Sequence, residues 1–124
     1  FGLHTNMQDE RSLNHDGEMI EYSRLHKMTI QAWSPYQYGN FAGIFLDNPK
    51  FPELNNAMQA LADEKQVTKS AIATAWILRH PAHFQVILGT MNPEHLAQNA
   101  AGADVTLSRQ EWYDIYFAAG NDLP

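Results

Sequence analysis

The residues with the clearest chemical meaning follow a short apolar run at 84–88. Gly89 ends that run, and Asn92 with Pro93 are residue types that open a helix, as N-cap and first-turn proline. A strand that leads straight into a helix N-terminus can bind an anion, because unpaired backbone N–H groups and the helix dipole point to the same place. The chain has no GxGxxG motif and no P-loop, so a phosphate here would be held by another kind of loop.

A second suggestive stretch begins where another apolar run, 28–33, ends at Trp33. Ser34-Pro35 stops this run, and a long loop follows over 34–51. The loop contains Gly39 and Gly43 and four aromatic residues that look exposed: Tyr36, Tyr38, Phe41 and Phe45. Loops of this length inside compact domains are usually either functional or disordered.

Other kinds of site find little support in the sequence. The six histidines include His80 and His83, but Pro81 between them discourages the helix that would bring them together. Asp47 and the Asp9-Glu10 pair have no visible ligand partners, so we predict no metal site. Zero cysteines exclude disulfides, thiolate ligands and a cysteine nucleophile, and no Gly-x-Ser-x-Gly elbow is present.

The composition is that of an ordinary globular domain. The chain has 124 residues, 44% hydrophobic and 18% charged, which is enough for one domain with its own core. Its net charge of −6, without basic runs, argues against a nucleic-acid partner or an anionic membrane. No apolar run approaches the ~18 residues of a membrane span. The absence of cysteine is compatible with a cytosolic enzyme, and we expect a cytoplasmic location.

Helical periodicity and capping residues predict the elements that position these residues. Helices are expected over about 17–26, 52–65, 69–79, 92–102 and 109–120, after an irregular stretch at 1–16. Asp16, Thr68 and Asn92 are N-cap candidates, and Ser108 with Glu111 forms a capping box. The inward faces are Met19, Ile20 and Leu25; Leu54, Ala57, Met58 and Leu61; and Trp112, Ile115, Tyr116 and Ala119.

Two strands, 28–33 and 84–88, are expected among these helices. Both are apolar runs without clean alternation, which is typical of parallel strands buried on both faces. The helix at 69–79 is apolar all round, which indicates burial on more than one side. Two strands do not make an independent parallel sheet, so the chain taken alone looks incomplete.

Four segments resemble the aldo-keto reductase family, in family order and at family spacing. They are Ile30-Gln31-Ala32-Trp33-Ser34-Pro35-Tyr36-Gln37-Tyr38-Gly39, the helix from Gln66-Val67-Thr68 to His80-Pro81, Gly89-Thr90-Met91-Asn92-Pro93-Glu94-His95-Leu96, and Ser108-Arg109-Gln110-Glu111-Trp112. The resemblance covers roughly residues 20–120.

The resemblance implies an α/β fold, the C-terminal fragment of a TIM (β/α)8 barrel. The strands at 28–33 and 84–88 would be the seventh and eighth, lying parallel with flanking helices, and residues 1–3 the tail of the sixth. Residues 1–124 would then be the C-terminal portion of a single barrel domain. The family's catalytic Asp, Tyr, Lys and His come from the second to fourth strands, so the resemblance places no catalytic residue in this chain.

The family's cofactor positions match residues here. The resemblance implies that Trp33 stacks on the nicotinamide, that Ser34, Tyr36 and Tyr38 reach the pyrophosphate, and that Gly39 and Gly43 act as hinges of the loop. At the other end of the cofactor, it implies that Thr90, Met91 and Asn92 bind the adenosine 2′-phosphate, with His95 on the helix behind them. Gln98 and Asn99 would hydrogen-bond the adenine. Structural alternatives stay open: Trp33 as core, the aromatic loop packing on itself, and Asn92 as a plain N-cap.

Two residues depart from the family pattern at the adenosine end. His95 replaces the usual Arg, and Gly89 lies where many members have Lys. A neutral imidazole supplies less charge than a guanidinium and cannot form its planar fork. The resemblance implies NADPH as cofactor, with NADH possible. We expect any preference for the 2′-phosphate to be modest and to strengthen below pH ~6.5, where an imidazole becomes charged.

The function implied by the resemblance is NAD(P)H-dependent reduction of aldehydes or ketones to alcohols. This chain would supply the cofactor-binding part, without turnover of its own. The alternative is a catalytically silent binding or structural module with the same fold. Unpaired strand edges and exposed apolar faces predict a further partner beside the small-molecule carbonyl substrate, either the rest of the barrel or a second copy of the chain.

Overall fold

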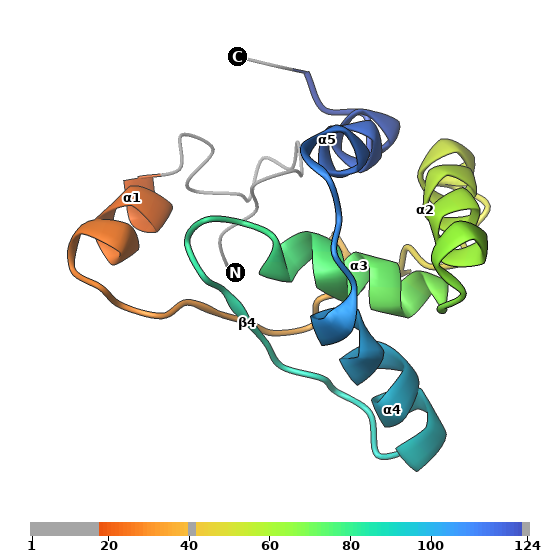
Figure 1. The fold of residues 1–124 in the computed structure, drawn as a ribbon, viewed down its shortest axis with the longest axis horizontal. Coiled ribbons are helices and arrows are strands. Elements are labelled where there is room, and N and C mark those ends of the chain that lie inside the picture. Colours follow the sequence, from red (N-terminus) through yellow and green to blue (C-terminus); the bar gives the residue numbers. More distant parts are fainter. Residues whose placement is uncertain (1–17, 40–41, 123–124) are drawn as a thin grey trace.

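The structure, a computed structural model, describes residues 18–39 and 42–122 (Figure 1). Its elements are α1 (Glu18–Leu25), β1 (Gln31–Ala32), β2 (Gln37–Tyr38), β3 (Gly43–Ile44), α2 (Pro52–Lys65), α3 (Lys69–Leu78), β4 (Gln85–Val86), α4 (Pro93–Ala100), the 3-10 helix η1 (Ala101–Asp104) and α5 (Arg109–Ala118). All five predicted helices are therefore present. Asp16, Phe41, the Asp9-Glu10 pair and the stretch at 1–16 lie outside the described residues.

The two expected strands pair in parallel, as predicted. Gln31 of β1 is opposite Gln85 of β4, and Ala32 is opposite Val86. The ladder bonds run from Gln85 N–H to the Ile30 carbonyl (3.0 Å) and from Ile87 N–H to the Ala32 carbonyl (2.9 Å). The connection between them carries α2 and α3, so this is the crossover arrangement of an α/β protein.

The strands are shorter than predicted, and they are not buried on both faces. Each has two residues, the first exposed and the second half-buried. On the exposed face, the Gln31 and Gln85 side chains hydrogen-bond across the pair (3.0 Å). The physical reason is that no other strand or layer within residues 18–39 and 42–122 continues this sheet, so nothing there covers its second face.

The hydrophobic core lies among the helices. Five consecutive residues at the centre of α3, 71–75, are buried, which confirms that this helix is covered on every side. Figure 1 shows α3 between α2, α4 and α5, and it contacts α2, α4, η1 and β4. The core cluster consists of Leu54, Met58, Ala62, Ile72, Ala73, Ala75, Leu107 and Ile115.

Capping side chains begin the helices where the sequence indicates. Thr68 accepts from the Ala71 N–H, and Asn92 accepts from two first-turn N–H groups. Ser108 and Glu111 complete a reciprocal capping box at the start of α5. The helix after Asn92 is α-helical only to Ala100 and continues as η1, because Gly102 packs directly on α3, where an added Cβ would lie 2.4 Å from the Ala71 carbonyl oxygen.

Two tryptophans join α3 to α5. The indole rings of Trp76 and Trp112 stack with centroids 4.6 Å apart and an interplanar angle of 5°. Each indole Nε1–H donates to the other residue's backbone carbonyl, both at 3.0 Å. Lys65 of α2 adds an ion pair with Glu111 of α5 at 2.7 Å. The three helices are therefore joined by polar contacts as well as by apolar burial.

The segment over 34–51 is not the open loop that the sequence suggests. It contains an antiparallel hairpin, β2–β3, with Gln37 opposite Ile44. Tyr36 and Phe45 pack against the core, so the expectation of exposed aromatics is wrong for them. Asn55 of α2, itself buried, explains the order: its amide donates to the carbonyls of Phe45 (2.8 Å) and Phe51 (2.9 Å).

The first helix has a different inward face from the predicted one. Ile20 is buried, but Met19 and Leu25 are 50% and 78% exposed. In Figure 1 α1 lies away from the helical core, and this position leaves its other apolar residues uncovered by the part of the chain described. Within that same part, no helix is both long and apolar enough to span a membrane.

Candidate functional site

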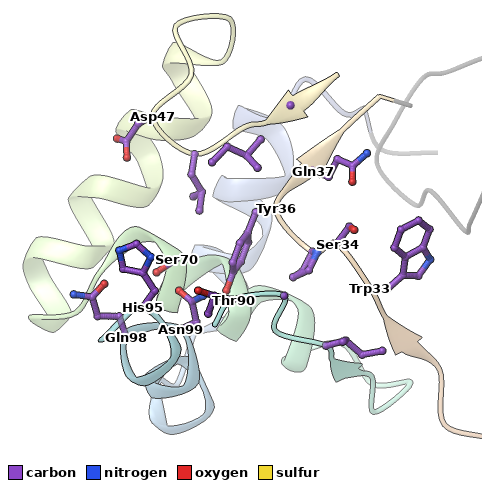
Figure 2. Close-up of a pocket in the computed structure, with 16 residues that line it drawn as sticks. Trp33, Ser34, Tyr36, Gln37, Asp47, Ser70, Thr90, His95, Gln98 and Asn99 are labelled. Carbon is purple, nitrogen blue, oxygen red and sulfur yellow. The ribbon is translucent and has the colours of Figure 1, made fainter. Parts of the chain in front are cut away.

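A cavity of about 790 Å³ opens where β1 and β4 end, bounded by the hairpin on one side and by α4 on the other (Figure 2). This volume is in the range of small-molecule sites. Its walls are formed by Trp33, Ser34, Pro35, Tyr36, Gln37, Gly43, Ile44, Leu46, Asp47, Ser70, Ile87, Gly89, Thr90, His95, Gln98 and Asn99.

The two parallel strands, the hairpin and the helices α3 and α4 bring these residues together. Because β1 and β4 are parallel, their carboxyl ends meet at one edge of the sheet, so Trp33 follows one strand and Thr90 the other at the same opening. The α4 residues His95, Gln98 and Asn99 share one face of the helix, at spacings of three and four. The N-terminus of α3 and the hairpin complete the wall, as Figure 2 shows.

Eight of the twelve predicted site residues line this cavity. They are Trp33, Ser34, Tyr36, Gly89, Thr90, His95, Gln98 and Asn99. The structure brings together both predicted groups, the one after the first strand and the one around the second helix start. This convergence comes from the parallel pairing alone, since the two groups are more than 50 residues apart in the sequence.

The other four, Tyr38, Gly39, Met91 and Asn92, do not line it. Met91 is 98% exposed. The Tyr38 ring packs edge-on against Phe51 (4.8 Å between centroids) and lies beneath the Lys50 amino group. These four residues are not part of the cavity wall, so their contact with a cofactor stays a prediction.

The N-terminus of α4 differs from the sequence expectation of unpaired N–H groups. Asn92 Oδ1 accepts hydrogen bonds from the N–H groups of Glu94 (2.9 Å) and His95 (3.4 Å), and Pro93 has no N–H to offer. The cap therefore takes the donors that an anion would use. A phosphate here must replace the Asn92 side chain or be held by neighbouring side chains such as Thr90.

Tyr36 is tied to the core through its hydroxyl. Its OH lies 2.7 Å from Thr74 Oγ1, and Thr74 in turn donates to the Ser70 carbonyl (2.9 Å). Burial raises the pKa of Tyr36, and the hydrogen bond with Thr74 offsets part of that rise. The hydroxyl is therefore neutral near pH 7.

Asn99 presents an amide to the cavity. Its side chain is only 8% exposed, and no hydrogen bond joins it to another of the residues at 18–39 and 42–122. No fully buried side-chain nitrogen or oxygen in the described ranges lacks a hydrogen-bond partner, so the Asn99 amide still has access to the cavity. It offers two donors and one acceptor oxygen, the groups that a purine edge would satisfy.

Ser34 has an unusual backbone conformation directly after Trp33. Its φ of 49° lies in the left-handed region, which non-glycine residues seldom adopt. Such strained residues cluster at binding sites, where the surrounding structure holds them. The turn at Ser34 directs the chain from β1 across the cavity mouth into the hairpin.

Sequence reasoning missed three polar wall residues: Gln37, Asp47 and Ser70. Asp47 follows the hairpin and forms an ion pair with Lys69 in the first turn of α3. The signal for Ser70 was its place in the turn after the Thr68 cap, but nothing in the sequence shows that this turn meets the cavity. No cluster of metal-ligating side chains occurs in the described ranges.

A family comparison agrees with this geometry. The model of the aldo/keto reductase family matches residues 3–117, nearly the whole chain. The chain belongs to the aldo/keto reductase family. Membership supports an oxidoreductase, and it accounts for strand ends and a helix start that build one cavity, since sites in (β/α)8 barrels lie at the carboxyl ends of the strands.

Two reductases are similar to this aldo/keto reductase chain. One, a 6-dehydroglucose reductase of Agrobacterium fabrum, is 34% identical over 101 residues, covering 81% of this chain and 32% of the relative. The other, a 6-dehydroglucose reductase of Novosphingobium aromaticivorans, is 32% identical over 106 residues, covering 85% and 34%. The chain therefore spans about a third of the length of the relatives it matches.

A solved structure shows the same fold. The crystal structure of a thermostable aldo-keto reductase in complex with the inhibitor epalrestat superposes with a TM-score of 0.67 at 20% sequence identity. The match covers 89% of this chain and 36% of that one. The arrangement of strands and helices seen here is thus part of an aldo-keto reductase fold.

Proposed function

We propose that this chain is the C-terminal, cofactor-binding portion of an NAD(P)H-dependent reductase that converts aldehydes or ketones to alcohols. The observation that carries the proposal is the cavity at the carboxyl ends of β1 and β4, walled by residues of both strand ends and of α4. Family membership supports the same reaction class.

The two ends of the cavity fit the two ends of a dinucleotide. Trp33, 53% exposed at the end of β1, offers a flat face on which a nicotinamide ring can stack. Asn99 and Gln98 offer amides to an adenine at the α4 end. When bound, the reduced nicotinamide supplies the hydride that a carbonyl carbon accepts, while the carbonyl oxygen takes a proton.

The proton donor, we infer, lies outside this chain. Within the cavity, Tyr36 is the one tyrosine, and its hydroxyl is held by Thr74 with a raised pKa. The resemblance places the family's proton-donating Tyr and its Lys on earlier strands. The chain by itself should therefore bind the cofactor and show no turnover.

A binding experiment tests the first half of this proposal. NADH and NADPH are titrated into the purified chain and into the complete polypeptide that carries it, and bound nicotinamide is followed by its fluorescence. Saturable binding is expected. Absence of binding of either cofactor to the complete polypeptide would refute the proposal.

A turnover assay tests the second half. The named activity of the two relatives makes a sugar carbonyl the first substrate to try. We expect oxidation of the reduced cofactor by the complete polypeptide and none by the 124-residue chain. Binding without turnover by the complete polypeptide, over a panel of aldehydes and ketones, would instead favour the alternative, a silent binding module of the same fold.

A further inference from the structure

We propose that the α4 end of the cavity selects NADH over NADPH, and that Asp47 is the residue that discriminates between them. The inference rests on the proposed function, and it concerns the group on the adenosine ribose: a 2′-hydroxyl in NADH, a 2′-phosphate in NADPH. All five residues Asp47, Ser70, His95, Gln98 and Asn99 line the cavity; in Figure 2 the last four lie close together, and Asp47 lies apart from them on the same side of Tyr36.

The charges in the cavity wall oppose a second phosphate. Among the wall residues that the structure describes there is no lysine or arginine, and Asp47 is the one carboxylate. A 2′-phosphate carries close to two negative charges and needs charge-assisted donors to replace its water. The ring nitrogens of His95 point in different directions, so an imidazole cannot form the planar bidentate fork of a guanidinium.

The Asp47 carboxylate already has a cation as its partner. Lys69 forms an ion pair with Asp47, and its side chain is only 16% exposed, whereas that of Asp47 is 77% exposed. Of the two partners, the carboxylate is therefore the one that is accessible to a ligand. A phosphate that recruited Lys69 would leave the Asp47 charge without its partner beside it.

A ribose hydroxyl suits the same place. The 2′-hydroxyl can donate a hydrogen bond to an Asp47 carboxylate oxygen, the arrangement by which an acidic residue recognises NAD in dinucleotide-binding folds of other topology. The Ser70 hydroxyl, which forms a hydrogen bond with Thr68 Oγ1 (2.9 Å), lies in the same wall. The polar groups therefore match a neutral ribose better than a phosphorylated one.

The test uses ligands that contain only the adenosine side. Affinities of the complete polypeptide for ADP-ribose and 2′-phospho-ADP-ribose are measured by calorimetry at low ionic strength. We expect ADP-ribose to bind about tenfold more tightly. Equal or tighter binding of the 2′-phosphorylated ligand would overturn the inference and leave the proposed function standing, whereas binding of neither ligand would refute both.

Two variants should shift the ratio of the affinities for ADP-ribose and 2′-phospho-ADP-ribose in opposite directions. Asp47→Asn removes the charge and keeps the backbone, because Asn tolerates the positive φ of 57° found at Asp47. It should improve binding of the phosphorylated ligand on the order of fivefold, because Lys69 becomes free. Lys69→Met leaves the carboxylate unpaired and should widen the ratio. Glu53→Gln, which removes an exposed carboxylate outside the cavity wall, is the matched control.

The pair of variants keeps the inference falsifiable even if one fails to fold. Circular dichroism shows whether each is folded. If Asp47→Asn and Lys69→Met change the ratio of the two affinities in the same direction, Asp47 does not discriminate between the ligands. The same conclusion follows if Glu53→Gln changes this ratio as much as Asp47→Asn does.

Discussion

The helical half and the strand half of this chain differ in how tightly their apolar side chains are packed. In α2, α3, η1 and α5 the core residues are nearly inaccessible, with Met58 and Ala62 each 1% exposed and Ile72 0%. Around β1, β4 and α1, large apolar side chains are open to solvent: Met28, Trp33 and Ile87 are 56%, 53% and 44% exposed. The helical half therefore buries its own apolar side chains, whereas the strand half leaves many of its apolar side chains exposed to solvent.

The contrast separates stability from binding. Buried area, caps, the tryptophan pair and an ion pair all lie in the helical half, so most of the free energy of unfolding should come from there. The strand half contributes two short ladders and the mouth of the cavity. A ligand, or a further layer of protein, would complete what the strands leave uncovered.

The largest effect is expected from Gly102→Ala in the helical half. The added Cβ would lie 2.4 Å from the Ala71 carbonyl oxygen and 2.6 Å from the Thr74 Cβ, which are backbone or buried atoms with no room to move. We expect a loss of about 3 kcal/mol in the free energy of unfolding, measured by urea denaturation followed by circular dichroism.

Gly89→Ala is the matched control from the strand half. The same methyl group there meets no atom within 4 Å. Its unfolding free energy should stay within about 0.5 kcal/mol of the parent value. Equal losses for the two variants would mean that the helical and strand halves do not differ in packing.

A loss of about 2 kcal/mol is expected for Trp112→Phe. The change removes the indole donor from the Trp76 carbonyl, leaving that partly buried acceptor without its bond, and it weakens the ring stack. The measurement is again the urea midpoint. Phe117→Leu, which alters a 44% exposed ring of the same helix, should change stability far less.

In the strand half, Trp33→Leu should act on binding rather than on folding. Loss of a stacking face should weaken NADH binding about tenfold, roughly 1.4 kcal/mol, with a smaller change in the urea midpoint. Tyr22→Leu, which removes a 58% exposed ring outside the cavity, is the control. A variant at Trp33 that unfolds more easily yet binds normally would contradict this division.

The smallest effect is expected from Glu111→Gln, which keeps the capping box and removes only the charge. The hydrogen bond from Lys65, followed by that from the Ser108 N–H, lowers the pKa of Glu111, and the hydrogen bond to Glu111 raises the pKa of Lys65. Near pH 7 the parent should be more stable by about 0.5 kcal/mol.

The sign of the pH dependence follows from these shifts. A carboxyl whose pKa is lowered on folding stabilises the protein above its ordinary value of about 4.3, and the advantage disappears as the pH falls through the folded-state value. For the lysine, the advantage is lost as the pH rises through the raised value. Urea midpoints of parent and variant at pH 3 and 7 test the carboxyl part of this statement, and a difference between the two proteins that is the same at both pH values would contradict it.

The sequence by itself determined the helices and the partner strands. Their signals are local: Thr68, Asn92 and Ser108 are caps whose side chains bond to N–H groups two or three residues away. The centre of α3 is apolar on every side, and this local composition likewise predicted that the helix is buried. Two groups of site residues followed from the family resemblance, and the parallel pairing brings most of them to one cavity.

Only the tertiary structure decided the hairpin within 34–51, the short exposed strands and the Asp47 position. The hairpin is held by Asn55 of α2, the strands lack a covering layer in the described ranges, and Asp47 meets Lys69 22 residues later. Each depends on contacts between segments distant in sequence, and no local propensity encodes them.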